Sequence, residues 1–293
     1  MEQTLSNNLL TVTIDTHGAE LQSIVSKTTG HQYLWQGDKT FWGRRSPVLF
    51  PIVGAVWQGR YRMDGREYEM GQHGFARDCD FTIVPDTPDD EAWFGLESDE
   101  AMLSRYPRRF RLEIGYRLQE ARLTVMWCVI NLDDRDMAFQ IGAHPAFNYP
   151  EFNPSDPVHG YFCFGPRDLQ AEVIEAKGCV GSETVSLSLD GHDMLPIEAT
   201  TFSRDAIILD DSQVRRVSLL DKHRAPYLTL LFSAPLVGLW SPSPSAPFVC
   251  IEPWWGRCDR IGFDGDFAAR EHVNTLAPGN TFDASYMIIF DNF

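Results

Sequence analysis

The chain has 293 residues, 43% of them hydrophobic, and a formal net charge of −16. That charge would repel nucleic acid and an anionic membrane, so neither is an expected partner. No apolar run reaches the length of a membrane span, and the first residues show neither the basic start nor the apolar stretch of a signal peptide. The six cysteines form no C-x-x-C pair, and several lie inside apolar strand-like runs, which favours reduced, buried thiols and a cytoplasmic protein.

Alternation of apolar and polar residues marks most of the first half of the chain as strands. Leu10, Val12 and Ile14 alternate with polar neighbours, as in a strand with one solvated face. Asp64-Gly65 separates two short segments of this kind and predicts a two-residue hairpin turn. The same pattern predicts further strands at 80–84, 92–98, 110–118 and 121–132.

Helical periodicity is scarce in this sequence. Ser98 is expected to cap one or two helical turns that end before Pro107. The second half returns to strands, which are predicted at 206–209, 214–220, 227–232, 248–251 and 285–290. Many strands with almost no helix predict an all-β fold, either a sandwich or a barrel. No linker or repeat divides the chain, so residues 1–293 are expected to form a single domain.

Four segments place ionisable side chains among aromatic, proline and glycine residues, at 42–54, 71–81, 141–150 and 250–263. His144 ends an apolar run and precedes Pro145, so its imidazole could face a pocket and exchange protons near neutral pH. Glu252 leaves an apolar strand beside Trp254, where burial would raise its pKa. Each also has a structural interpretation, as a hydrogen-bonded core histidine and as a surface glutamate at a strand end.

Two other segments supply candidate binding residues. His73 lies beside glycines and is expected to project from a loop rather than sit in a core. One of Arg44 and Arg45 is expected to point inward, where sugar oxygens, a phosphate or a carboxylate could satisfy it. A metal site of His73, His144 and a carboxylate stays open, although no two histidines have the short spacing such sites often show. Motifs of serine hydrolases, P-loop proteins and dinucleotide-binding proteins are absent from the sequence.

The four segments together resemble a known family. In chain order they contain an arginine before P-V-L-F-P-x-V-G, then H-G-F-A-R, then G-x-H-P-x-F-N, and then E-P-W-W-G ahead of a closing L-x-P-G-N. This order resembles the aldose 1-epimerase, or galactose mutarotase-like, family, and most closely its bacterial epimerase-like branch. The resemblance runs from about residue 5 to the last predicted strand and so covers essentially the whole chain.

The resemblance implies a fold and a site. The fold would be a large antiparallel β-sandwich, the galactose mutarotase-like supersandwich, with the sugar in a cleft on its concave face. The family's acid histidine falls on His144 and its base glutamate on Glu252. Its substrate-contacting histidine and arginine fall on His73 and Arg44. Its aspartate matches Asp205 best, and the spacing does not separate Asp205 from Asp210 or Asp211. No cofactor and no metal is required.

The activity that this resemblance implies is mutarotation of an aldohexose, free or 6-phosphorylated, by acid–base opening of the ring. A small-molecule sugar would be the partner, and the sequence does not indicate the oligomeric state. Trp240, Trp254 and Phe147 are expected to form apolar walls against the sugar ring. The alternative is a non-catalytic carbohydrate-binding or regulatory protein on the same fold. A metal-dependent sugar isomerase is a third interpretation.

Overall fold

Strands form most of the regular secondary structure in the computed structural model, which describes residues 1–291. The predicted alternation places them well: Leu10–Asp15 forms β2, and its buried side chains are those of Leu10, Val12 and Ile14. The Asp64-Gly65 turn joins β5 (Arg60–Met63) to β6 (Arg66–Glu69), as predicted. Two-fold alternation works here because successive side chains of a strand point to opposite faces of its sheet.

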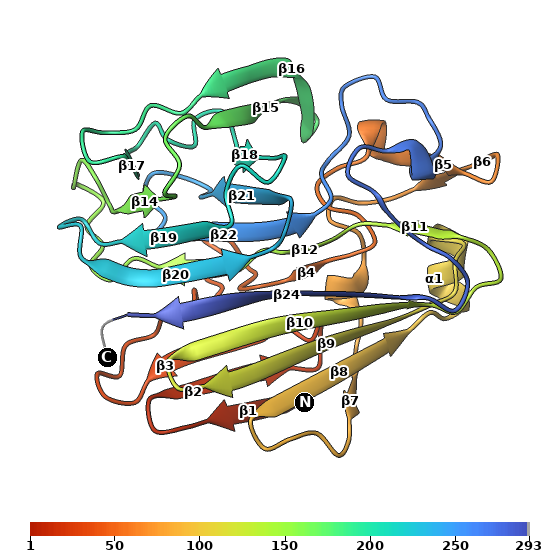
Figure 1. The fold of residues 1–293 in the computed structure, drawn as a ribbon, viewed down its shortest axis with the longest axis horizontal. Helices are drawn as coiled ribbons and strands as arrows, with labels where there is room; N and C mark the ends of the chain where they lie inside the picture. The colour runs from red at the N-terminus through yellow and green to blue at the C-terminus, as the bar shows by residue number, and fades with distance from the viewer. Residues whose placement is uncertain (292–293) are drawn as a thin grey trace.

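The larger of two main sheets has nine strands, which Figure 1 shows largely side by side. Their order is β17 (Met194–Pro196), β14 (Tyr161–Cys163), β19 (Arg216–Leu220), β20 (Pro226–Phe232), β24 (Thr281–Phe290), β10 (Arg122–Asn131), β9 (Phe110–Gln119), β8 (Glu91–Glu97) and β7 (Thr82–Val84).

The second main sheet has eight strands and carries the site described below. Its order is β16 (Cys179–Ser186), β15 (Gln170–Ala176), β18 (Ile207–Leu209), β21 (Leu236–Trp240), β22 (Phe248–Trp255), β12 (Ile141–Ala143) and β4 (Val48–Leu49), with β13 (Ala146–Asn148) also paired to β22.

Smaller sheets complete the fold. They are β1 (Glu2–Ser6), β2 and β3 (Leu21–Ser26); β5 and β6; and β11 (Met137–Phe139) with β23 (Asn274–Leu276). The pairings between named strands in residues 1–291 are antiparallel. The predicted all-β, antiparallel sandwich is therefore confirmed. Residues 292 and 293 lie outside the described part, and the single-domain boundary of 1–293 stays a prediction.

The core fills the space between the two main sheets. Trp127 of β10 meets Trp255 of β22 edge to face, with ring centroids 5.5 Å apart. Val249, Ile251 and Trp255 of β22 join the same core cluster, whereas Glu252 and Trp254 turn to the opposite face of the strand. This strand runs on through Glu252 to Trp255, beyond the predicted end at residue 251, because Glu252 stays in register with Gly238 of β21.

The short helix α1 (Glu100–Arg105) lies where one or two helical turns were predicted. Its cap is Asp99 and not Ser98, because the Asp99 carboxylate accepts the Met102 amide at 2.7 Å. The cysteines within residues 1–291 are free thiols, three of them buried, in agreement with the predicted reduced state. In that same range, no helix combines the length and the apolar character needed to cross a membrane.

Candidate functional site

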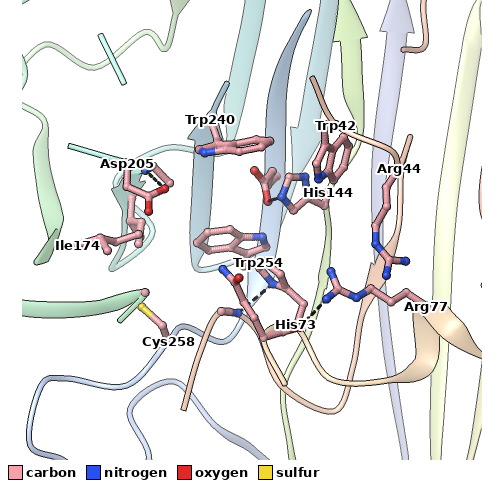
Figure 2. Close-up of a pocket in the computed structure, with 16 residues that line it drawn as sticks. Trp42, Arg44, His73, Arg77, His144, Ile174, Asp205, Trp240, Trp254 and Cys258 are labelled. Atoms are coloured by element: carbon pink, nitrogen blue, oxygen red, sulfur yellow. Dashed lines mark hydrogen bonds and ion pairs between the residues drawn. The ribbon is translucent and has the colours of Figure 1, made fainter. Parts of the chain in front are cut away.

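A pocket of about 410 Å³ opens on the face of the eight-stranded sheet that turns away from the core. Figure 2 shows tryptophan, histidine and arginine side chains converging on this space. Of the sequence-predicted residues, seven line it: Arg44, His73, His144, Asp205, Trp240, Glu252 and Trp254. The structure therefore brings together residues that lie more than 200 positions apart in the chain.

His144 and Glu252 form the polar centre of the pocket. His144 directly follows β12, Glu252 lies in the middle of β22, and the His144 Nε2 atom is 3.3 Å from the Glu252 Oε2 atom. Both side chains are buried. Within residues 1–291, His144 Nδ1 and Glu252 Oε2 have no hydrogen-bond partner. Buried polar atoms are nearly always hydrogen-bonded, so these two are exceptions at the centre of the pocket.

Burial controls the protonation of this pair. It raises the pKa of the Glu252 carboxyl well above its usual value and lowers the pKa of the His144 imidazole to about 3. The short contact has the geometry of an ion pair, but removing two charges from water costs more than their attraction returns, so the neutral pair is favoured. Across neutral pH the pair then holds one proton, on Glu252, with His144 as the vacant base.

His73 is the second imidazole of the pocket. The Gly54 amide donates to His73 Nδ1 at 3.1 Å, which leaves the proton of the neutral ring on Nε2 and makes that atom a donor. Its ring meets the His144 ring edge to face, with centroids 5.5 Å apart. The prediction that His73 stands on a loop is confirmed, but the expectation that it avoids burial is wrong: burial lowers its pKa well below the usual range.

The loop that carries His73 depends on a glycine. His73 itself has a φ of 65°, and Gly74 follows with a φ of 71°. A Cβ on Gly74 would lie 2.1 Å from the carbonyl oxygen of Phe50, so only glycine fits there. The Gly-rich context that pointed to His73 in the sequence is thus the feature that presses this loop against β4.

Two guanidinium groups line one end of the pocket. Arg44 Nη2 donates to the Asp78 carboxylate at 2.8 Å, and Arg77 Nη2 donates to the Gln72 carbonyl at 2.7 Å. Burial and the nearby charge of Arg44 lower the pKa of Arg77 to about 10, and within residues 1–291 the Arg77 Nε has no partner. Arg45 does not line the pocket, because its guanidinium donates to Gln22 instead.

Trp254 forms the apolar floor of the pocket. Its Nε1 donates to the Ala143 carbonyl at 3.2 Å, which fixes the plane of the indole. Gly142 and Gly238 lie against this indole from the strands on either side, and a Cβ on them would be 2.6 Å and 2.5 Å from it. Because Gly142 and Gly238 have no side chains, they leave a recess in which the Trp254 indole lies.

For the sugar that the family resemblance implies as substrate, we expect Gly142→Ala to lower kcat/KM about 10- to 100-fold, because the indole must move toward a ring bound in the pocket and misplaced contacts are costly. Overpacking should also lower the free energy of unfolding by about 1–3 kcal/mol. Gly115→Ala is the matched control, since its Cβ would lie 2.5 Å from the Trp93 indole on the other main sheet. Equal kinetic losses in the two variants would show that the recess does not shape the site.

Asp205 lies across the pocket from the histidines, as Figure 2 shows. Its backbone has a φ of 70°, and its Oδ1 accepts the Ala206 amide at 2.8 Å. Its negative charge adds to the burial that raises the pKa of Glu252. Asp210 and Asp211, which the sequence could not separate from it, do not line the pocket and instead lie with His272.

Phe147 is the one predicted site residue that the structure places elsewhere. Its side chain is fully buried in the core between the sheets and does not line the pocket, so the expectation of an apolar wall there is wrong. The reason is strand alternation in β13: Ala146 faces the same side as Cys250, and Phe147 therefore faces the opposite side. The predicted walls at Trp240 and Trp254 do line the pocket.

Sequence reasoning missed Trp42 and Arg77 as pocket residues. Both lie inside the segments singled out above, but neither falls in a periodic pattern that shows the direction of its side chain. Trp42 stacks on His144, with ring centroids 4.7 Å apart and planes 26° apart. A signal for Arg77 existed in its position four residues after His73, on the same Gly-containing loop.

Metal-ligating side chains also meet at the site. Possible ligand atoms of His144, Cys250 and Glu252 lie within 4.8 Å of one another, and a second group joins Asp210, Asp211 and His272. The first group shares His144 and a carboxylate with the metal site considered from the sequence, but it contains Cys250 in place of His73. Cys250 is fully buried and does not line the pocket, and we derive no step of the reaction from a metal.

The fold and the site together define a β-sandwich protein of the sugar-epimerase class. The chain belongs to the aldose 1-epimerase family, whose sequence profile matches residues 1–160. It is 32% identical to the chromosomal protein LacX of Lactococcus lactis over 307 aligned positions, which cover 98% of this chain and 99% of LacX.

Solved structures agree with this assignment. A galactose mutarotase related enzyme from Lactobacillus acidophilus is 32% identical and superposes with a TM-score of 0.91, covering 100% of this chain and 98% of that one. A galactose mutarotase-like protein from Lactobacillus casei is 30% identical with a TM-score of 0.93, covering 99% and 100%. The family resemblance and the supersandwich fold expected from the sequence are therefore confirmed.

Proposed function

We propose that the protein is a mutarotase that interconverts the α and β anomers of an aldohexose, with His144 and Glu252 as its acid–base pair. The observation that carries the proposal is the 3.3 Å contact between their side chains in a buried pocket lined by aromatic rings. A pair that holds one proton always has one member able to donate and one able to accept. Membership of the aldose 1-epimerase family supports this chemistry.

The reaction needs two proton transfers on either side of the anomeric carbon. Ring opening begins when the pair's proton passes from Glu252 to His144 across their 3.3 Å contact. The Glu252 carboxylate then takes the proton of the C1 hydroxyl, the bond between C1 and the ring oxygen breaks, and the His144 imidazolium gives its proton to that oxygen. After rotation about C1–C2, the roles exchange: Glu252 returns its proton and His144 accepts one as the ring closes. Each positioned group of this kind contributes about 10²–10⁴-fold in rate.

The remaining pocket residues bind and orient the sugar. The flat indole of Trp254 offers an apolar surface for one face of the ring. His73 Nε2, which carries the ring proton, is placed to donate to a sugar oxygen, and Asp205 accepts from a hydroxyl at the opposite end. Charged and polar groups at both ends fix which carbon meets the acid–base pair.

The two guanidinium groups favour a phosphorylated substrate over a free one. Asp78 forms an ion pair with Arg44, and Arg77 keeps its charge beside this second cation in a buried place. A phosphate would satisfy both, since arginine forms strong charge-assisted bonds with phosphate oxygens. The diffuse charge of −16 opposes approach of an anion, but two guanidinium groups at contact distance outweigh it.

The proposal is tested by following anomerisation of freshly dissolved α-glucose and α-galactose by polarimetry or proton NMR, beside glucose 6-phosphate and galactose 6-phosphate. Acceleration above the spontaneous rate supports a mutarotase, and the sugar with the highest kcat/KM defines the substrate class. Sugar binding by calorimetry without any acceleration would instead support the alternative, a carbohydrate-binding protein on this fold. Loss of activity with a chelator would support the metal-dependent isomerase.

For the phosphorylated sugar we expect Arg77→Gln to raise KM about 10- to 100-fold, the effect of losing one hydrogen bond to a charged group. The value of kcat should change less, because Arg77 does not contact the acid–base pair. Arg44→Gln should behave in the same way, and Arg45→Gln serves as the control because Arg45 does not line the pocket. A KM for the free sugar that rises as much as that for the phosphate ester would contradict a phosphate subsite.

A further inference from the structure

The His144 ring is held between two tryptophans that come from distant parts of the chain. Trp42 stacks on it at 4.7 Å, and Trp240 meets it edge to face at 5.5 Å. Figure 2 shows Trp42 beside His144 on the arginine side of the pocket and Trp240 on the other side. The ring therefore has little freedom to rotate about its side-chain bonds.

Trp42 is fixed from behind by contacts of its own. It lies in a segment that forms no strand, yet its carbonyl accepts the Trp35 Nε1 proton at 2.8 Å. Its ring also stacks on Phe248 of β22, with centroids 6.1 Å apart. An aromatic cluster that reaches from β22 thus places the face of one indole against the imidazole.

From this geometry we infer that Trp42 is a positioning residue that orients His144 and stabilises its protonated form during ring opening. The inference rests on the proposed function, which requires an imidazolium at that step. The face of an indole carries negative electrostatic potential and attracts a cation that lies against it, most strongly where water is excluded. No other side chain gives His144 a stacked aromatic face among the ring pairs of residues 1–291.

The other neighbours of His144 make this contribution necessary. Burial penalises the imidazolium, and the positive charges of Arg44 and Arg77 penalise it further. The titratable groups that face the ring are those of Glu252, His73, Cys250, Arg44 and Arg77. Among them only the Glu252 carboxylate, once ionised, favours a charged His144. Trp42 adds a second attraction that persists in both protonation states of Glu252.

The first test compares Trp42→Leu with Trp42→Phe. We expect kcat to fall about 3- to 30-fold in the leucine variant, the range for loss of one cation–π contact, with KM changed less than about 2-fold. The phenylalanine variant keeps an aromatic face and should recover most of kcat. Trp93→Leu, which removes a half-buried tryptophan from the other main sheet, controls for lost packing and should leave kcat unchanged. Equal losses with leucine and phenylalanine, or none, would overturn the inference.

The second test does not depend on catalysis. The ring resonances of His144 are assigned by comparison with His144→Gln, and their titration is followed by ¹⁵N-edited NMR in the free protein. If the indole stabilises the imidazolium, Trp42→Leu keeps the pKa of His144 as low as in the parent or lowers it further. If Trp42 only excludes water, the pKa rises toward the ordinary value near 6.5 and the inference fails. A parent protein that accelerates no anomerisation would reject the proposed function while this titration still decides the contact.

Discussion

Glu252→Gln should reduce kcat for anomerisation about 10²- to 10⁴-fold while leaving the fold intact, because the amide has the shape of the carboxyl but cannot exchange a proton. The side chain is buried in the middle of β22, opposite Gly238, where a larger or smaller group would disturb the sheet. The amide avoids that disturbance. Because the loss lies in the proton transfers and not in sugar contacts, KM should change little. The measurement is the rate of anomer interconversion by proton NMR.

The control for this variant is its stability. Removing a buried carboxyl whose pKa is raised by burial takes away a group that folding must keep neutral, so the free energy of unfolding near neutral pH should not fall. The sign follows from the raised pKa: above the unfolded pKa of about 4.5, the native protein holds a proton that the unfolded chain releases, which destabilises the fold as pH rises. A variant that unfolds readily would make its kinetics uninformative, and turnover equal to the parent would remove Glu252 from the mechanism.

Much of the sheet architecture could be predicted because strand alternation is a local property of the sequence. Leu10, Val12 and Ile14 are buried where the pattern placed them. The end of β22 was placed too early because Pro253 resembles a strand terminator, whereas in the structure Pro253 stays in register with Val237 of β21. Here pairing with a neighbouring strand, which a single segment does not reveal, prevailed over local propensity.

Prediction of the site depended on how far each side chain is fixed by its own segment. His144 and Glu252 end or interrupt apolar strands, so both were visible as polar groups in a buried context. Phe147 belongs to a similar run, but successive side chains of β13 alternate between the two faces of the sheet, and Phe147 faces the core. The sequence around it does not show which residues of β13 face the core and which face the pocket. Trp42 reaches the site from a segment without regular structure, where no period indicates direction.

The Trp254 recess shows a further limit of sequence reasoning. Gly142 and Gly238 were not notable as single glycines, and neither has a positive φ that would require glycine. Their importance appears only when β12, β22 and β21 are placed side by side, because the indole of the central strand then covers both neighbours. The need for glycine at these two positions depends on how three separate segments pair. A single sequence does not reveal that pairing.

His144→Gln should lower kcat as strongly as Glu252→Gln, about 10²- to 10⁴-fold, since each transfer of the pair's single proton needs both residues. The informative comparison is the double variant. If the two residues act as one unit, removing the second costs little once the first is gone. The kcat of the double variant should then lie within about 10-fold of the kcat of the less active single variant. Independent roles would instead multiply the two losses in kcat.

The single and double variants are compared by the same NMR assay, with sugar binding measured separately by calorimetry. Multiplied losses would mean that His144 and Glu252 act on separate steps, and the one-proton mechanism would have to be abandoned even if mutarotation itself is observed.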